Sequence, residues 1–263
     1  MESADSLRLV IFFFILIVLT ILETFFERKM RVQPRQGRWL TNGLMTIANT
    51  ATVYAMGLVM PIMVAGAAVF TMRYQIGGLH FVDLPFWVET VIAIIVLDFV
   101  IWGQHLVTHH VPILWRLHRV HHSDRDIDVT SAIRFHPLEI AFSIFVKIAA
   151  IFILGPAALA VVLFEILLNG MAMFNHANLA VPRWLDAGLR KIIVTPDMHR
   201  VHHSVYRAEH DHNFGFMLSV WDRLFGTYTA QPKDGHEDMV LGLTWQDERP
   251  AHPIWALMLP FRK

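Results

Sequence analysis

The chain has 263 residues, no cysteine and a formal net charge of zero, with 22 basic and 22 acidic side chains. The lack of cysteine excludes disulfides, iron–sulfur clusters and thiolate zinc sites. A neutral net charge gives no global basic field, so no nucleic-acid partner is expected. Hydrophobic residues make up 55% of the sequence and lie in long runs, which is typical of an integral membrane protein.

Four apolar runs predict a bundle of about four to five membrane-spanning helices. The runs cover residues 9–26, 44–72, 84–102 and 138–174. The first run lacks the basic start and the small-residue cleavage site of a secretory signal. It is therefore expected to stay as an anchor, with a cleaved signal as the alternative. Pro61 lies inside the second run and predicts a kink there.

The fourth run is too long for a single span, which needs about 20 residues. Gly155 and Pro156 interrupt it near the middle, and Pro breaks a helix because it lacks the backbone N–H donor. We therefore predict a helical hairpin with arms at 138–154 and 157–174. The alternative is one tilted, kinked helix followed by a segment that lies in the membrane interface.

Two charged residues lie within this hairpin, where an unpaired charge is costly. Lys147 and Glu165 stand at similar distances from the interruption, on opposite arms. We expect them to pair inside the membrane. In the alternative, the Lys147 ammonium reaches the membrane surface and Glu165 faces the active site.

Basic residues after the first run set the expected orientation. By the positive-inside rule this loop is cytoplasmic, which places the N-terminus outside and the C-terminus in the cytoplasm. Every histidine cluster then falls on the cytoplasmic face of a multi-pass membrane protein. The basic residues of the loop are Arg28, Lys29, Arg31, Arg35 and Arg38.

An identical hexamer, His-Arg-Val-His-His-Ser, occurs at residues 118–123 and again at 199–204. On a helix, its histidines at i, i+3 and i+4 project from one face. A further pair at i and i+4 lies near the end of the third run. Neutral imidazole is a common metal ligand, and these clusters are enough to hold two metal ions. The eight histidines are His105, His109, His118, His121, His122, His199, His202 and His203.

Other residues are candidates for the same site. His176 lies at the returning end of the hairpin and is expected to be a ligand, although a lone histidine is more often a packed core residue. His212 is a further ligand candidate. Asp98, His136 and Asn213 are expected to orient a ligand or contact the substrate, and Asp98 is a natural acceptor for the second N–H of a ligand. A buried structural carboxylate is the alternative for Asp98. The histidines taken as surface residues are His80, His236 and His252.

An all-nitrogen site suits iron, zinc, copper or nickel. A hydrolase would carry a carboxylate base such as that of H-E-x-x-H, which is absent here. A transporter would hold its ligands near mid-membrane, whereas these clusters lie at one membrane face. The residues therefore favour O₂-dependent oxidation of a C–H bond in a lipid. A membrane metal-binding or metal-transport protein and a zinc-dependent membrane hydrolase are the alternatives.

These clusters resemble the three histidine boxes of the fatty acid hydroxylase / sterol desaturase superfamily, H-x3-H, H-x2-HH and H-x2-HH. The boxes correspond to residues 105–109, 118–122 and 199–203. The likeness extends to Arg-Phe-His-Pro at 134–137, to Asn-Phe-Gly at 213–215, and to residues 221–228. It covers roughly residues 84–228, which is most of the chain.

The resemblance implies an O₂-dependent hydroxylase or desaturase with two irons, which zinc can replace in purified protein. It also implies a separate electron-donor protein, and that the box histidines and His176 act as catalytic metal ligands. The last ligand stays open, with His212 as the candidate. Sterol, fatty acyl, ether lipid and carotenoid substrates stay open, as does the oligomeric state. A basic patch would dock an acidic carrier, or it reflects ordinary positive-inside bias. The patch comprises Arg183, Arg190, Lys191, Arg200 and Arg207.

Together these patterns predict an all-α membrane helical bundle with a cytoplasmic helical cap that holds a histidine-rich dimetal site. The expected organisation has three parts. Residues 1–83 form N-terminal anchor helices, residues 84–230 form the histidine-box catalytic domain, and residues 231–263 form a cytoplasmic tail rich in proline and charge.

Overall fold

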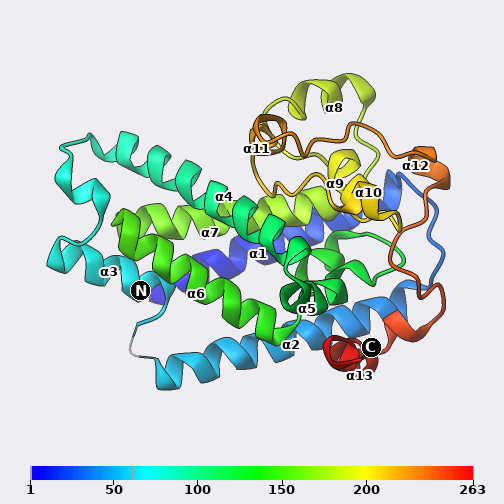
Figure 1. Cartoon of the computed structure of the whole chain (residues 1–263), viewed down its shortest axis with the longest axis horizontal. Helices are drawn as coiled ribbons and strands as arrows, with labels where there is room; N and C mark the ends of the chain where they lie inside the picture. The colour runs from blue at the N-terminus through cyan, green and yellow to red at the C-terminus, as the bar shows by residue number, and fades with distance from the viewer. Residues whose placement is uncertain (1, 61, 263) are drawn as a thin grey trace.

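The computed structural model describes residues 2–60 and 62–262, and its regular elements are helices. The long helices lie side by side in one bundle, and the short helices gather around one end of it (Figure 1). This arrangement confirms the predicted all-α fold. The long helices are α1 (Glu2–Phe25), α2 (Arg35–Val59), α3 (Val64–Tyr74), α4 (Phe86–His110), α6 (Pro137–Leu154) and α7 (Ala158–His176).

Five segments of the described chain are long and apolar enough to cross a membrane. Large apolar side chains point outward from them, as at Phe14 and Ile153, which are 66% and 77% exposed. Water would solvate such a surface poorly, whereas lipid chains would cover it. The prediction of a multi-pass membrane bundle is therefore confirmed. The segments are Ser6–Phe25, Arg35–Phe81, Phe86–His110, Pro137–Leu154 and Ala158–His176.

The predicted hairpin is confirmed, and a close backbone contact explains where it turns. Helix α6 ends at Leu154, and the next residue, Gly155, has a left-handed φ of 68°, a conformation that glycine adopts without steric cost. A Cβ atom on Gly155 would overlap the backbone of the loop at Ile76 and Gly77. The turn is therefore held by packing against the loop that follows α3.

The second apolar run forms two helices. Helix α2 ends at Val59 and α3 begins at Val64, so the chain breaks its helix where one kinked span was expected. Pro61 itself lies outside the described residues. Helix α3 packs against α6 and α7, whereas α2 packs against α6 and the short helix α13.

The predicted pair between Lys147 and Glu165 is also confirmed. The Lys147 Nζ atom lies 3.1 Å from Glu165 Oε1. The second carboxylate oxygen of Glu165 accepts a hydrogen bond from Arg8 Nη2 at 2.6 Å. Glu165 therefore joins α1, α6 and α7, and the partnering removes much of the cost of placing these charges among apolar helices.

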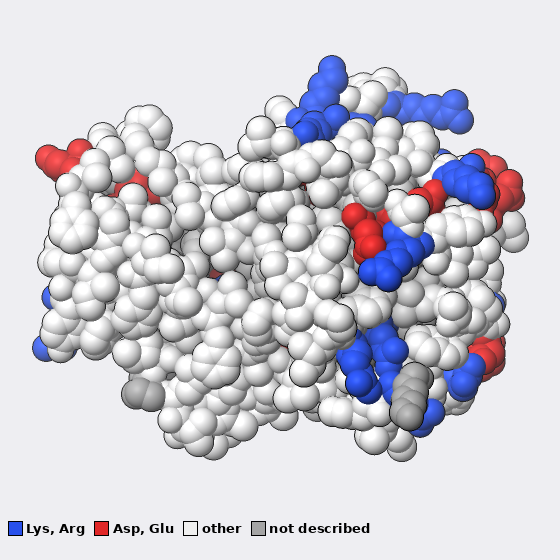
Figure 2. Space-filling model, in the orientation of Figure 1, with Lys and Arg blue, Asp and Glu red and all other residues white. Residues whose placement is uncertain are grey.

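The short helices form a polar end to the bundle. Lys, Arg, Asp and Glu side chains gather over this end, whereas few of them lie over the rest of the visible face (Figure 2). The last helix, α13, packs against α2 and brings the C-terminal segment back onto the bundle (Figure 1). The short α-helices are α5 (Pro112–His122), α8 (Arg183–Leu189), α9 (Pro196–His202), α10 (Arg207–His210), α11 (Val220–Leu224), α12 (Gly235–Asp238) and α13 (Pro253–Met258). The 3₁₀ turns are η1 (Gly78–Phe81), η2 (Val129–Ile133), η3 (Arg249–Ala251) and η4 (Leu259–Phe261).

Candidate metal centre

Nine histidines, carried by α4, α5, α7, α9 and the residue directly after α9, converge in two groups. The helices that carry them meet where the long helices join the short ones (Figure 1). The two groups adjoin, and within each group the available ring nitrogens lie within 4.8 Å of one another. All nine side chains are at most 3% exposed. The five-histidine group comprises His105, His109, His118, His122 and His202, and the four-histidine group comprises His121, His176, His199 and His203.

Hydrogen bonds fix the tautomers of several of these rings. The Nδ1 atom of His105 lies 2.7 Å from the Phe214 carbonyl oxygen, and that of His202 lies 2.7 Å from the His212 carbonyl oxygen. In the other group, His176 Nδ1 lies 2.6 Å from the Ala172 carbonyl oxygen. A carbonyl oxygen can only accept, so in each case Nδ1 carries the proton and Nε2 carries a lone pair.

The Nε2 atoms turn toward one another. Those of His105 and His118 are 3.0 Å apart, and that of His176 lies 3.1 Å from the Nε2 atoms of both His121 and His199. Further Nε2 atoms are buried without a hydrogen-bond partner, and they belong to His109, His122, His202 and His203.

Convergent lone pairs repel one another unless a cation lies between them, so this donor set fits metal ions. Metal binding also requires the neutral imidazole. For five histidines of the two hexamers the ring pKa is held well below its ordinary value of 6.5, first by burial and then by neighbouring imidazoles. This holds for His121, His122, His199, His202 and His203.

His212 does not join either group. Its contribution to the site comes from its backbone, because its carbonyl oxygen orients the His202 ring. Asp98 does not bond a histidine either. Its Oδ2 atom accepts from Trp221 Nε1 at 2.8 Å and from the Leu218 backbone N–H at 3.2 Å, so it fastens the segment around α11 to α4.

His136 and Asn213 lie outside both groups as well. The His136 ring accepts from the Leu138 backbone N–H and caps the start of α6, while its Nε2 faces the Leu257 carbonyl at 3.2 Å. Asn213 adopts a left-handed φ of 57°. Its side chain donates to the carbonyls of Met198 and Thr229 at 2.9 and 2.8 Å, which ties α9 to the chain that follows it.

Two carboxylates that the sequence patterns did not single out support the site. Glu139, in the first turn of α6, accepts the His118 Nδ1–H at 2.6 Å. Asp222 accepts backbone N–H groups from Phe214 and Gly215 at 2.9 Å each. Asp222 therefore holds in place the Phe214 carbonyl that orients His105. Glu139 directly follows Arg-Phe-His-Pro-Leu, so that motif was the available signal.

Three expectations about surface residues were wrong. Arg190 was placed in the surface basic patch, but it is buried and pairs with Asp186 Oδ2 at 2.5 Å. Arg200 was placed in the surface basic patch, but it is fully buried and bonds Asp197 Oδ1 at 2.5 Å. His236 was taken as a surface residue, but it is only 6% exposed. Its ring faces Asp197 at 3.6 Å, and burial lowers its pKa to about 4. His236 is buried because α12 packs against α9, and Arg200 is buried between Asp197 and the Ala177 carbonyl.

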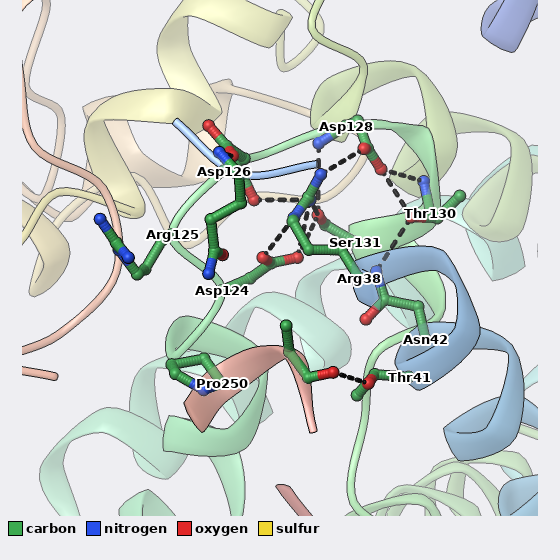
Figure 3. A network of polar contacts seen from close by, with 12 residues as sticks. Arg38, Thr41, Asn42, Asp124, Arg125, Asp126, Asp128, Thr130, Ser131 and Pro250 are labelled. Carbon is green, nitrogen blue, oxygen red and sulfur yellow. Dashed lines mark hydrogen bonds and ion pairs between the residues drawn. The ribbon is translucent and has the colours of Figure 1, made fainter. Parts of the chain in front are cut away.

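A buried polar network holds the chain that follows the second box (Figure 3). The Arg38 guanidinium, on α2, makes a bidentate contact with Asp124 at 2.7 and 2.8 Å and also bonds Asp128 at 2.6 Å. Burial alone would raise the pKa of Asp124, but the charge and hydrogen bonds of Arg38 bring it below its ordinary value. Arg38 thus fixes the loop directly after His122.

Arg134 secures the same box from the other side. It is fully buried and donates to the Val120 carbonyl at 2.9 Å, to Ser123 Oγ at 3.1 Å and to the Pro250 carbonyl at 2.7 Å. A fourth bond, at 3.0 Å, joins it to Asn42 on α2. Helix α2 and the C-terminal segment therefore both brace the second histidine box.

A cavity of about 240 Å³ runs from the five-histidine group into the bundle. His105 and His118 line its inner end, and side chains of α4, α6 and α7 form its walls. Lys147 lies two helical turns along α6 from Glu139, which corresponds to about 12 Å. The lining is mixed, with apolar residues such as Ile101, Ile140 and Leu168 beside polar groups.

Comparison with known proteins assigns this architecture. A family described as fatty acid hydroxylase matches residues 90–227, which is just over half of the chain and contains all nine histidines. The chain belongs to the fatty acid hydroxylase family. The resemblance read from the three histidine boxes is confirmed. No solved structure gives a significant match.

Individual relatives belong to the same superfamily. Ornithine lipid hydroxylase OlsE of Rhizobium tropici is 28% identical over 83% of this chain and 66% of its own length. Alkylglycerol monooxygenase of Homo sapiens is 35% identical over 62% of this chain, and the match covers 33% of that relative's own length. Very-long-chain aldehyde decarbonylase GL1-5 of Oryza sativa subsp. indica is 28% identical over 59% of this chain and 26% of its own length.

Proposed function

We propose that this family member uses O₂ to hydroxylate a C–H bond of a lipid at two iron ions held by the nine histidines. The observation that carries the proposal is the pair of adjoining groups of buried imidazoles at the polar end of an apolar bundle. Relatives named for hydroxylation of ornithine lipid and mono-oxygenation of alkylglycerol support a lipid substrate.

Each part of the site has its own role in the proposed reaction. Two irons held there would supply the activation of O₂ that an unactivated C–H bond requires. Glu139 and the Phe214 carbonyl keep His118 and His105 in the ligating tautomer. The cavity beside these two histidines would place a lipid carbon next to the five-histidine group, and its helical walls limit the access of water. The reaction converts one C–H bond, one O₂, two electrons and two protons into C–OH and water.

We also propose that the histidine end faces the cytoplasm. The basic loop after α1 contacts the histidine-bearing segments directly, because Arg28 Nε bonds Asp197 Oδ1 at 3.1 Å, two residues before His199. The loop and the metal centre therefore share one side of the membrane. The positive-inside rule assigns that side to the cytoplasm, and a cysteine-accessibility assay on substituted loop positions tests the assignment.

The function is tested on protein purified anaerobically from iron-supplied cells. Two results together would support the proposal. One is about two irons per chain, as two groups of nitrogen ligands predict, and the other is transfer of one labelled oxygen atom from ¹⁸O₂ to a lipid. A double bond without labelled oxygen would replace hydroxylation by desaturation. Zinc alone, with no O₂ consumption after reconstitution with iron, would contradict the oxygenase and favour the metal-binding alternative.

A further inference from the structure

A second cavity reaches the five-histidine group from the polar side of the molecule. It has a volume of about 300 Å³ and lies between α5, α10 and the segment 243–245. His109 lines it, together with Trp115, Arg119 and His210. It shares no lining residue with the cavity that enters from the bundle. The five-histidine group is thus accessible from two separate sides, and we name this second opening the α5–α10 cavity.

An aromatic ring joins the α5–α10 cavity to two of the metal-ligand candidates. The Trp115 ring centre lies 4.9 Å from that of His109 and 5.4 Å from that of His122. Trp115 also stacks on His210, with ring centres 5.3 Å apart and planes 18° apart. Trp115 is half-buried. Its position gives a short route of conjugated rings from the cavity wall to the histidines.

The rim of the α5–α10 cavity is basic. Arg119 lines the cavity and Arg116 lies one turn before it on α5, and both donate to backbone carbonyls of the C-terminal turn at 2.7 Å. Neither forms an ion pair with a carboxylate among the described residues. Arg207 is 77% exposed on the opposite rim, and its partner Asp211 is the acidic residue that lines the cavity. Positive charges therefore outnumber negative ones here.

We propose that the α5–α10 cavity docks an acidic one-electron carrier protein, and that Trp115 is the route by which electrons would reach a metal ion held by the five-histidine group. Complementary charge steers such encounters and fixes their orientation. Each docking event oxidises the carrier by one electron. Two events, with two protons from the solvent, supply the electrons and protons that hydroxylation by O₂ requires. The inference rests on the proposed function, which itself requires an external reductant.

Binding to the full-length protein in nanodiscs tests the docking surface. The probes are two acidic carriers, a plant-type ferredoxin and a flavodoxin, with a basic cytochrome as the charge control. We expect Arg116→Glu and Arg207→Glu each to weaken acidic-carrier binding about tenfold or more at low salt, because rim charges act mainly through steering. At high salt the variants and the wild type should bind the carriers with similar affinity. Arg183→Glu is the matched control, since Arg183 is exposed on α8, away from this cavity. Equal weakening by Arg183→Glu, or no salt-sensitive binding of either acidic carrier, would overturn the proposal.

Electron transfer tests the role of Trp115. In anaerobic stopped-flow reduction, Trp115→Leu should slow reduction several-fold at saturating carrier, with carrier affinity and metal content unchanged and Trp115→Phe less affected. Arg207→Glu should instead raise the carrier concentration for half-maximal rate. Unchanged rates in Trp115→Leu would contradict the route. Wild-type protein without iron or lipid oxidation would refute the proposed function itself. Iron-loaded protein that oxidises lipid with dithionite, yet binds carriers regardless of the rim charges, would refute only the docking site.

Discussion

The five-histidine and four-histidine groups differ in what orients their rings and in what reaches them. In the first group, carboxylates of Glu139 and Asp211 face His118 and His109, and backbone carbonyls face His105 and His202. In the second group, His176 and His121 face backbone carbonyls at 2.6 and 3.3 Å, and no carboxylate among the described residues bonds a ring. Both cavities reach the first group, and no member of the second lines either of them. We therefore propose that substrate and reductant reach the first group, and that the second group has the structural task of holding its metal ion.

The largest effect is expected from two separate variants, each of which removes one ligand candidate from one of the groups. His199→Ala leaves three nitrogens in its group, whereas His122→Ala leaves four. Four donors satisfy a typical protein metal site. We expect His199→Ala to lower bound metal from about two to about one per chain and to abolish lipid oxidation, with His122→Ala retaining more metal. Metal analysis of both variants measures this, and equal losses would remove the distinction between the groups.

Arg38→Ala should disturb both histidine groups alike. Arg38 holds the loop after the second histidine box, and the histidines of that box belong to both groups. Its loss leaves Asp124 and Asp128 buried without their partner, which costs about 3–5 kcal/mol of unfolding free energy. In the wild type the pKa values of both carboxyls are depressed. Their stabilising contribution is therefore present above the ordinary pKa of 3.8 and is lost as pH falls through the depressed values.

In Arg38→Ala these carboxylates are buried without the cation that compensates their charge. The free energy of unfolding should therefore differ most from that of the wild type at neutral pH, and this difference should narrow as pH falls toward 4. Denaturant unfolding in detergent at several pH values measures it. Arg249→Ala removes an exposed arginine that pairs with Asp247 and serves as the control, with no expected change. A gap that widens on acidification would contradict the account of Arg38.

Glu139→Gln tests whether the five-histidine group depends on its carboxylate. The amide cannot supply the charge that favours the protonated Nδ1 of His118, so metal affinity of this group should fall about 10–100-fold. Metal titration with a competing chelator measures the change. The four-histidine group should keep its affinity. Glu237→Gln, at an 83% exposed side chain, is the control, and loss from both groups would show a structural role for Glu139.

Lys147 gives the smallest effect, and it concerns the cavity rather than the metals. In Lys147→Met, Glu165 keeps Arg8 as its partner, whereas Glu165→Gln leaves two cations facing each other. Glu165→Gln should therefore lower the yield of folded protein more than Lys147→Met does. Lys147→Met should change the KM for lipid several-fold with metal content unaltered. A reversed order of yields would show that Lys147, not Glu165, is the centre of this pair.

Exchanging both charges sharpens the test of the pair. Lys147→Glu combined with Glu165→Lys restores one opposite-charge contact but places an ammonium beside Arg8. Expression should recover only partly relative to either single reversal. Full recovery would show that Arg8 contributes nothing to the pair, and no recovery would show that the pairing between α6 and α7 is unimportant.

Much of the architecture follows from patterns that are local in sequence. Long apolar runs require membrane-spanning helices because unsatisfied backbone groups are too costly in lipid. Gly155 and Pro156 place the hairpin turn because both residues interrupt helical geometry. The hexamer spacing aligns three histidines because residues three and four apart share a helix face. These features need no knowledge of distant contacts.

The sequence by itself thus determined the membrane bundle, the hairpin and the nine histidines as candidate ligands. Only the tertiary structure decided how they divide, since it sends His121 and His122, adjacent in sequence, to different groups. Tertiary contacts also place the Glu139 carboxylate, and not that of Asp98, against His118, and they bury Arg38 against Asp124. The physical reason is that helical spacing fixes which residues share a face, whereas helix packing and loop closure fix what that face meets.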